Sequence, residues 1–284
     1  MTQSQGPDHK EVVREEWTAA APFWKKWNQK LANQSRAATE LVVNGAELLP
    51  GMHVLDLASG TGEPALSVAQ VVGPGGRVVA TDLVPGMLEA VGENARTRGL
   101  TQMEFQVADA EQLPFANGEF DRVTCRFGIM FFPEVQQALR EIRRVLKPGG
   151  RVSFATWGSL AENPLFSTAL GPFLKRLNVP PPPRDAPHVF RFADETKLAS
   201  TLATAGFAGV KTSKTQVAWP WPGPPEEAWE SMKELAAPFR KLIAAVPPDQ
   251  METTVGEVMV GIRRFYDGKS VNFPATVVTV TGTA

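Results

Sequence analysis

Cysteine and tyrosine are almost missing from this chain of 284 residues, which contains one of each. A single cysteine, Cys125, excludes an internal disulfide and a thiolate metal cluster, and its β-rich surroundings predict a buried core position. No apolar run approaches the roughly 18 residues of a membrane span, and the polar N-terminus does not resemble a signal peptide. We therefore expect a cytoplasmic protein with no membrane span and no metal site.

Neither sign of charge dominates, because 29 Lys and Arg face 30 Asp and Glu, for a formal net charge of -1. The densest basic stretch, Arg140 to Lys147, has the apolar spacing of a solvated helix face, so we expect no nucleic-acid partner. At 43% hydrophobic residues the chain can bury a sizeable core. The expected partner is a small molecule.

The most informative stretch reads V-L-D-L-A-S-G-T-G, from Val54 to Gly62. It is an apolar run that ends at an acid and a glycine-rich turn. A helical pattern follows from Pro64, and a second apolar run, Arg77 to Thr81, ends in Asp82. In a doubly wound α/β sheet this order makes a nucleoside pocket. The glycines let the ligand approach the backbone closely, and the acid accepts hydrogen bonds from the ribose hydroxyls. The sequence thus predicts an adenosine-containing cofactor.

Two kinds of adenosine cofactor fit this pattern. Gly60 to Ala65 matches the dinucleotide fingerprint, and Asp82 follows at about the expected 20 residues. Three features favour S-adenosylmethionine instead. Asp56 suits a cationic ligand and would repel a pyrophosphate, and Pro64 lacks the N–H that a pyrophosphate would use. Asp109-Ala110-Glu111 places further acids at the end of a third strand, where they can accept from an adenine amino group.

Five short motifs occur in the order and at the spacings of one enzyme family. They are Asp56-Leu57-Ala58-Ser59-Gly60-Thr61-Gly62, Thr81-Asp82, Ala108-Asp109-Ala110-Glu111, Phe120-Asp121 and Leu146-Lys147-Pro148-Gly149-Gly150. The region from Leu48 to Trp157 therefore resembles the class I S-adenosylmethionine-dependent methyltransferases, and in particular the ubiquinone/menaquinone-biosynthesis type. Ala58 departs from the family's fullest motif, which has a glycine there.

The resemblance implies a cofactor site built from the motif residues and their neighbours. We expect it to comprise Asp56, Ala58, Ser59, Gly60, Thr61, Gly62, Asp82, Leu83, Met87, Asp109, Ala110, Glu111 and Arg126. The resemblance is specific for the cofactor and poor at naming a substrate, because one fold hosts many functions.

Strand and helix patterns alternate along the central region. They cover His53–Ala58, Pro64–Val72, Arg77–Thr81, Pro85–Arg98, Met103–Ala108, Phe120–Arg126, Glu134–Leu146 and Arg151–Thr156, with tight turns at Pro74–Gly76 and Pro148–Gly150. A helix capped by Asp194 and strands at Val210–Trp219 and Val271–Thr281 follow. This alternation predicts an α/β fold with a doubly wound, Rossmann-like, mostly parallel sheet. The family resemblance implies seven strands, the last inserted antiparallel between two neighbours.

The remaining segments predict a helical cap over the carboxyl ends of the strands, where open α/β sheets bind ligands. Four prolines at Pro180–Pro183 mark one departure, and a rigid loop at Trp221–Pro225 marks another. Pro22 is expected to split the first helix. The resulting division is 1–45 N-terminal cap helices, 46–158 cofactor-binding core, 159–191 cap insertion, 192–223 core continued, 224–268 helical cap insertion and 269–284 final strand.

Methyl transfer from a sulfonium is an in-line displacement that needs mainly alignment and exclusion of water. His188 is the candidate base, because it lies in the expected cap, whereas His9 and His53 have structural interpretations. The acceptor site is expected to involve Trp24, Phe127, Met130, His188 and Trp229. Packing of the cap on the sheet is the simpler explanation for any single tryptophan.

The sequence thus predicts transfer of a methyl group from S-adenosylmethionine to a small, apolar or aromatic acceptor. Two alternatives stay open at this point. One is an NAD(P)-dependent oxidoreductase with a degenerate fingerprint, and the other is a non-catalytic S-adenosylmethionine-binding protein on the same fold.

Overall fold

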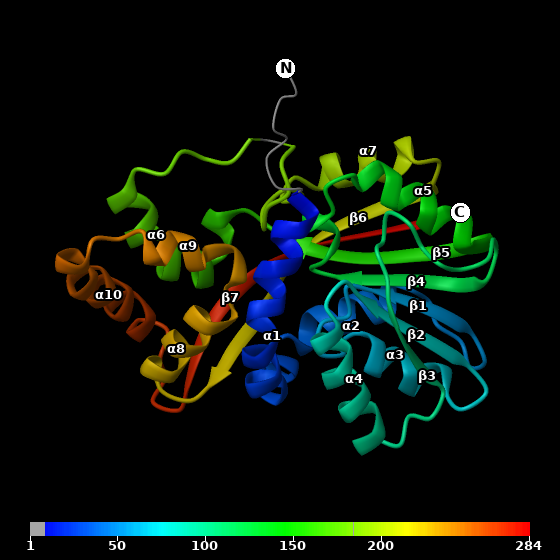
Figure 1. The fold of residues 1–284 in the computed structure, drawn as a ribbon, viewed down its shortest axis with the longest axis horizontal. Coiled ribbons are helices and arrows are strands. Elements are labelled where there is room, and N and C mark those ends of the chain that lie inside the picture. The colour runs from blue at the N-terminus through cyan, green and yellow to red at the C-terminus, as the bar shows by residue number, and fades with distance from the viewer. Residues whose placement is uncertain (1–8, 184) are drawn as a thin grey trace.

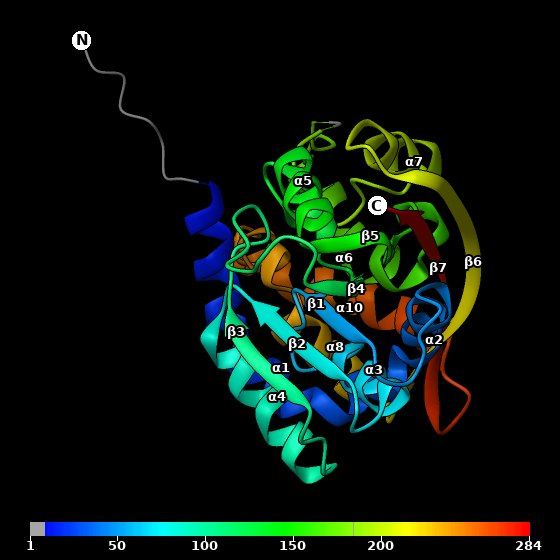
Figure 2. The same ribbon diagram turned by 90° about the vertical axis from the view of Figure 1, so that its right-hand side faces the viewer.

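The computed structural model describes residues 9–183 and 185–284, and a seven-stranded sheet runs through its centre. The strands are β1 His53–Leu57, β2 Arg77–Asp82, β3 Met103–Val107, β4 Phe120–Arg126, β5 Leu146–Trp157, β6 Ala208–Pro222 and β7 Ser270–Thr283. Their order is β3-β2-β1-β4-β5-β7-β6 (Figure 2). β7 pairs antiparallel with both β5 and β6, and the pairings among β1 to β5 are parallel. The predicted doubly wound sheet with an antiparallel last strand is confirmed.

Helices cover both faces of the sheet. In Figure 1, α5 and α7 lie on one face, and α2, α3 and α4 lie on the other. Their bounds are α2 Arg36–Gly45, α3 Ala65–Val72, α4 Pro85–Thr97, α5 Val135–Val145 and α7 Glu195–Thr204. Asp194 caps α7 as expected, because its carboxylate accepts from the backbone N–H of Thr196 at 2.9 Å.

The other helices form a cap. Figure 1 shows α6, α8, α9 and α10 gathered on the left, with α1 running between them and the sheet. The cap elements are α1 His9–Gln34, α6 Pro164–Leu177, α8 Pro225–Leu235, α9 Arg240–Ala244 and α10 Pro248–Arg263, with short 3-10 turns at Ile129–Phe131, Leu160–Glu162 and Ala237–Phe239. Within the described residues, no helix is both long and apolar enough to cross a membrane.

The central strands of the sheet are buried, as strands of parallel sheets usually are, whereas the edge strands β3 and β6 are largely exposed. Leu55, Val123, Phe154 and Val278 come from four different strands and are fully buried in one continuous apolar core. Cys125 belongs to the same core, as expected from its β-rich surroundings. Because the strands are held firmly from both sides, the loops at their carboxyl ends start from fixed positions.

The expectation that Pro22 splits the first helix is wrong. α1 runs from His9 to Gln34 with Pro22 inside it. Beside Pro22 the helix is packed on the protein, because Ala20 is fully buried and Ala21 lies in an apolar cluster with Val84 and Met87. Tertiary contacts of this kind override the local preference of a proline.

The turn predicted at Pro148–Gly150 lies inside β5, which begins at Leu146. The chain leaves the ladder there, because β5 advances five residues, from Leu146 to Arg151, while β4 advances two, and Gly149 has a left-handed φ of 75°. One turn prediction needs correction. The loop expected from Trp221 begins later, since β6 continues to Pro222. β6 pairs only with β7, and an edge strand tolerates proline because one side of its backbone needs no partner.

Candidate functional site

A cavity of about 300 Å³ lies between the sheet and the cap. Successive strands bring Ser59, Asp82, Asp109, Phe127 and Trp157 to its wall, each at or just after a carboxyl end. We call the wall formed by the loops after β1, β2 and β3 the polar half. We call the wall formed by lining residues between positions 127 and 243 the aromatic half.

The glycine-rich loop after β1 forms the floor of the polar half. Ala58 and Gly60 both have left-handed backbone angles, with φ of 51° and 53°. Glycine adopts this conformation without strain, which explains why the family's fullest motif has a glycine at position 58. The backbone N–H of Gly60 donates to Asp82 Oδ2 at 2.9 Å. The loop is therefore tied to the end of β2.

Asp82 has a structural role that the sequence did not reveal. Besides accepting from Gly60, its carboxylate accepts at Oδ1 from the backbone N–H of Val84 at 3.0 Å. Burial raises the pKa of Asp82, although the backbone hydrogen bonds oppose this. Each carboxylate oxygen can accept a second hydrogen bond, so the predicted role toward ribose hydroxyls is compatible with these contacts.

Asp56 lies beneath the loop and is fully buried. Its Oδ1 accepts from the Thr124 hydroxyl at 2.6 Å, while Oδ2 has no hydrogen-bond partner among the described residues. Burial raises the pKa of Asp56 to about 7, against the effect of Thr124 and of nearby Arg126. The carboxyl is thus poised between its neutral and charged forms near neutral pH, one layer behind the cavity wall.

The acids after β3 are bridged by the first helix. Lys10 Nζ lies 2.5 Å from Asp109 Oδ2 and 2.6 Å from Glu111 Oε2. Although burial opposes it, hydrogen bonding to both acids raises the pKa of Lys10. Asp109 and Glu111 line the cavity, as expected of acids near an adenine, but α1 contacts the same carboxylates.

The aromatic half is an apolar cage. Phe127 has a left-handed φ of 61° and stacks on Trp157 with ring centroids 4.1 Å apart. Trp219 packs edge-on against Trp157 at 4.7 Å, and Phe166 does so from another side at 5.0 Å. Among the described lining residues of this half, none is Asp, Glu, His, Lys, Arg, Cys or Tyr. Such a wall favours a flat, apolar ligand and supplies no acid or base.

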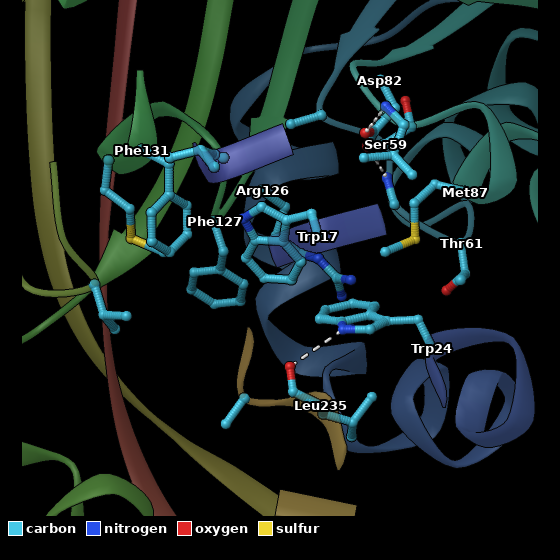
Figure 3. A pocket seen from close by; sticks show the side chains of 18 of the residues that line it. Trp17, Trp24, Ser59, Thr61, Asp82, Met87, Arg126, Phe127, Phe131 and Leu235 are labelled. Atoms are coloured by element: carbon cyan, nitrogen blue, oxygen red, sulfur yellow. Dashed lines mark hydrogen bonds between the residues drawn. The ribbon is translucent and has the colours of Figure 1, made fainter. Parts of the chain in front are cut away.

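Two tryptophans of α1 separate the halves. Figure 3 shows Trp17 and Trp24 between Ser59, Asp82 and Met87 on one side and the phenylalanines on the other. The Trp17 ring lies 5.6 Å from that of Trp24 and 5.6 Å from that of Phe131. The Trp24 indole N–H donates to the carbonyl of Leu235 at 3.3 Å.

The structure brings most of the predicted site residues to one cavity. Those that line it are Ala58, Ser59, Gly60, Thr61, Asp82, Leu83, Met87, Asp109, Ala110, Glu111 and Arg126 from the cofactor set, and Trp24, Phe127, Met130 and Trp229 from the acceptor set. Asp56 and Gly62 lie behind the lining.

His188 is not among the residues that line the cavity. Its Nδ1 accepts from the backbone N–H of Phe190 at 3.1 Å, which holds the imidazole in its own turn. Burial, together with nearby Lys197 and Arg191, lowers the pKa of His188. The neighbouring Val189 lines the cavity instead. The structure therefore does not bring the candidate base to the site.

Several lining residues were missed in the sequence. Trp17, Phe131, Trp157, Phe166 and Trp219 shape the aromatic half and its boundary. Trp157 carried a usable signal, because it ends a strand on the side where ligands bind. Trp17 and Phe166 come from cap helices, which have no fixed place in the sequence pattern. Phe131 follows β4 and Trp219 lies on β6, the edge strand. No group of three or more His, Cys, Asp or Glu within residues 9–183 and 185–284 is arranged to hold a metal ion.

Comparisons with known proteins agree with this geometry. The sequence model of the ubiE/COQ5 methyltransferase family matches residues 23–179. An uncharacterized protein of Mycobacterium tuberculosis, Rv1405c, is 37% identical over 152 residues, which cover 51% of this chain and 53% of that protein. The ubiquinone/menaquinone biosynthesis C-methyltransferase UbiE of Bordetella avium is 40% identical over 131 residues, covering 46% of this chain and 51% of the enzyme.

The match therefore spans about half the length of these curated relatives. Among solved structures, the YcgJ protein of Bacillus subtilis is similar with a TM-score of 0.57 and 22% identity, over 87% of this chain and 98% of that chain. At this level of identity the likeness concerns the fold alone.

Proposed function

The chain belongs to the ubiE/COQ5 methyltransferase family, and we propose that it transfers a methyl group from S-adenosylmethionine to a small, apolar, ring-shaped acceptor. One observation carries the proposal. A single cavity joins a polar half with acids at two strand ends to an aromatic half without titratable side chains. A cofactor in the polar half would direct its sulfonium methyl group toward the rings of the aromatic half.

The polar half supports S-adenosylmethionine over a dinucleotide. Asp56 and Glu63 lie on either side of the glycine loop, and the acids Asp109 and Glu111 stand at the end of β3. Acids in these positions suit a ligand that carries an ammonium and a sulfonium. Pro64 precedes the first residue of α3 and offers no N–H to a phosphate.

The aromatic half supports a carbon nucleophile. A base is needed only when the nucleophile arrives protonated at high pKa, and this wall has no side chain to act as one. An electron-rich ring carbon forms its bond to the methyl carbon as the methyl–sulfur bond breaks and S-adenosylhomocysteine leaves. The ring proton is lost to water only afterwards, so the attack itself needs alignment rather than a base. The rings of Phe127 and Trp157, stacked at 4.1 Å, offer a flat surface for such an acceptor. The relative named a C-methyltransferase acts in ubiquinone and menaquinone biosynthesis.

Calorimetric titration of the whole chain with S-adenosylhomocysteine and NAD in parallel tests the cofactor. We expect micromolar or tighter binding of S-adenosylhomocysteine and no binding of NAD. The reverse result would favour the oxidoreductase. Incubation with S-adenosylmethionine carrying a labelled methyl group and a panel of quinols, phenols and amines then tests transfer. Binding of S-adenosylhomocysteine with no labelled product from any ring acceptor would favour a non-catalytic binding protein.

A further inference from the structure

Arg126 lies at the end of β4, where the two halves of the cavity meet (Figure 3). Its Nη1 donates to the Ser35 hydroxyl and, at 2.8 Å, to the Thr39 hydroxyl. Each hydroxyl donates in turn to a backbone carbonyl, Ser35 to Leu31 at 2.7 Å and Thr39 to Ser35 at 3.3 Å. Both hydroxyl hydrogens are therefore used, and the oxygen lone pairs are left to accept from the guanidinium.

This arrangement fixes the guanidinium without neutralising it. Ser35 and Thr39 are each only 4% exposed and carry no charge. They belong to the junction between α1 and α2, which packs against β4 and β5. Burial lowers the pKa of Arg126, against the opposing effects of Glu63 and Asp56, but arginine stays charged in proteins. A fixed cation thus stands in the cavity wall.

One edge of the guanidinium lacks partners. The buried Nε–H has no acceptor among the described residues. Nη2 also makes no hydrogen bond to the described residues. Unlike Nε, it is not fully enclosed, so it opens on the cavity that Arg126 lines. Buried donors are nearly always paired in native proteins, so an unpaired one calls for an explanation. Nε and Nη2 lie on the same edge of the guanidinium, and Nη2 is the donor that an anion in the cavity can reach, because Nε is enclosed.

The position of Arg126 in the sheet indicates which part of the proposed cofactor its guanidinium would face. β2 and β4 flank β1 on opposite sides. Asp82 on β2, with Asp109 after β3, occupies the side where the ribose and adenine of the proposed cofactor would lie. The methionine end must then reach across the glycine loop toward β4, which ends in Arg126. The Arg126 guanidinium also lies 5.8 Å from the Phe127 ring, next to the place where the methyl group would be delivered.

We propose that Arg126 binds the α-carboxylate of S-adenosylmethionine, and that Ser35 and Thr39 are the positioning residues that hold its guanidinium ready. The inference rests on the proposed function, because it assigns one end of the same cofactor. It also gives the α1–α2 junction a part in binding, although neither hydroxyl need touch the ligand. The matching ligand without that carboxylate, 5′-methylthioadenosine, keeps the adenine, ribose and thioether.

The experiment compares the affinities of S-adenosylhomocysteine and 5′-methylthioadenosine by calorimetry. Arg126→Met should weaken S-adenosylhomocysteine by about 10- to 100-fold, as expected for a lost hydrogen-bonded charge. The double variant Ser35→Ala/Thr39→Val should weaken S-adenosylhomocysteine binding by a smaller factor. Arg126→Lys should weaken it by a factor between those of the other two variants. In all three variants, the affinity for 5′-methylthioadenosine should change by less than twofold.

Arg122→Met is the matched control. Arg122 lies on the same strand, but its guanidinium donates to the carbonyls of Ala46 and Glu47 and it does not line the cavity. Neither ligand should be affected in this variant. Should Arg126→Met fail to fold, Thr39→Val, which preserves the side-chain volume, carries the same comparison.

Equal losses for both ligands would make Arg126 a purely structural residue and overturn the inference alone. So would an unchanged affinity for S-adenosylhomocysteine accompanied by a raised KM for the methyl acceptor, since the arginine would then serve the acceptor. A wild-type protein that binds neither ligand would overturn the proposed function, and the assignment of the carboxylate with it.

Discussion

Replacing Asp56 by asparagine should stabilise the cofactor-free protein above neutral pH. The carboxyl is fully buried, with one oxygen bonded to Thr124 and the other without a partner among the described residues. Burial raises its pKa from 3.8 to about 7, although Thr124 lowers it. Folding therefore disfavours the charged form of this side chain, and asparagine removes the charge while keeping the shape.

The sign and size of the effect follow from proton binding. Between about pH 4 and pH 7 the folded protein holds a proton on Asp56 that the unfolded chain has lost, so stability from this group is present below pH 4 and disappears as the pH rises through about 7. The separation of the two pKa values corresponds to about 4 kcal/mol at most, at about 1.4 kcal/mol per tenfold change. The advantage of Asp56→Asn over wild type should therefore grow as the pH rises from 4 to 7 and reach about 1–4 kcal/mol above pH 7.

Urea unfolding followed by tryptophan fluorescence at several pH values between 5 and 8.5 measures this difference, because other titrating groups cancel between variant and wild type. Asp121→Asn is a control of opposite sign. The Asp121 pKa is lowered, since hydrogen bonding to Lys147 and the His53 backbone outweighs partial burial. Its substitution should therefore cost stability at neutral pH and less in acid. An Asp56→Asn difference that stays constant with pH would refute the reasoning.

Three further outcomes are expected. Asp82→Ala should reduce S-adenosylhomocysteine affinity by about 1.5–3 kcal/mol in calorimetry, because two ribose hydroxyls lose their acceptor and the glycine loop loses its tie; a change below twofold would contradict this. Gly60→Val should abolish binding while lowering the thermal transition by only a few degrees, since φ is 53° and the loop must lie against the ligand. Amide hydrogen exchange should be faster in α8 and α10 than in β1, and should slow when S-adenosylhomocysteine and an acceptor bind; equal, ligand-insensitive protection would show a fixed cap.

The polar half could be predicted because its residues are close together in the sequence. The glycine loop and the acid at the end of β2 follow each other within about one strand–helix–strand unit, and sheet geometry alone brings them together. The sheet was predictable for the same reason, since apolar runs and short turns mark each strand. The antiparallel place of β7 came from the family resemblance, because a β-branched run does not reveal its direction.

The aromatic half could not be predicted in the same way. Its rings come from the ends of β4 and β5, from β6 and from cap helices, and no periodic pattern records which of them will meet. Trp219 illustrates this, because its strand was predicted but nothing in the sequence places that strand's end beside Trp157 and Phe127. His188 is the opposite case, because its place in the sequence was known and its side-chain position was not. It stood at a suitable place in the sequence, but its neighbour Val189 lines the cavity.

The first helix and the residue after it contact both halves of the cavity and the cap. Lys10 bridges the acids after β3, Trp17 packs on Phe131 in the aromatic half, and Trp24 bonds to the carbonyl of Leu235 in the cap. The residue that follows the helix, Ser35, holds Arg126. α1 therefore contacts both halves of the cavity, although the two halves come from separate stretches of the sequence.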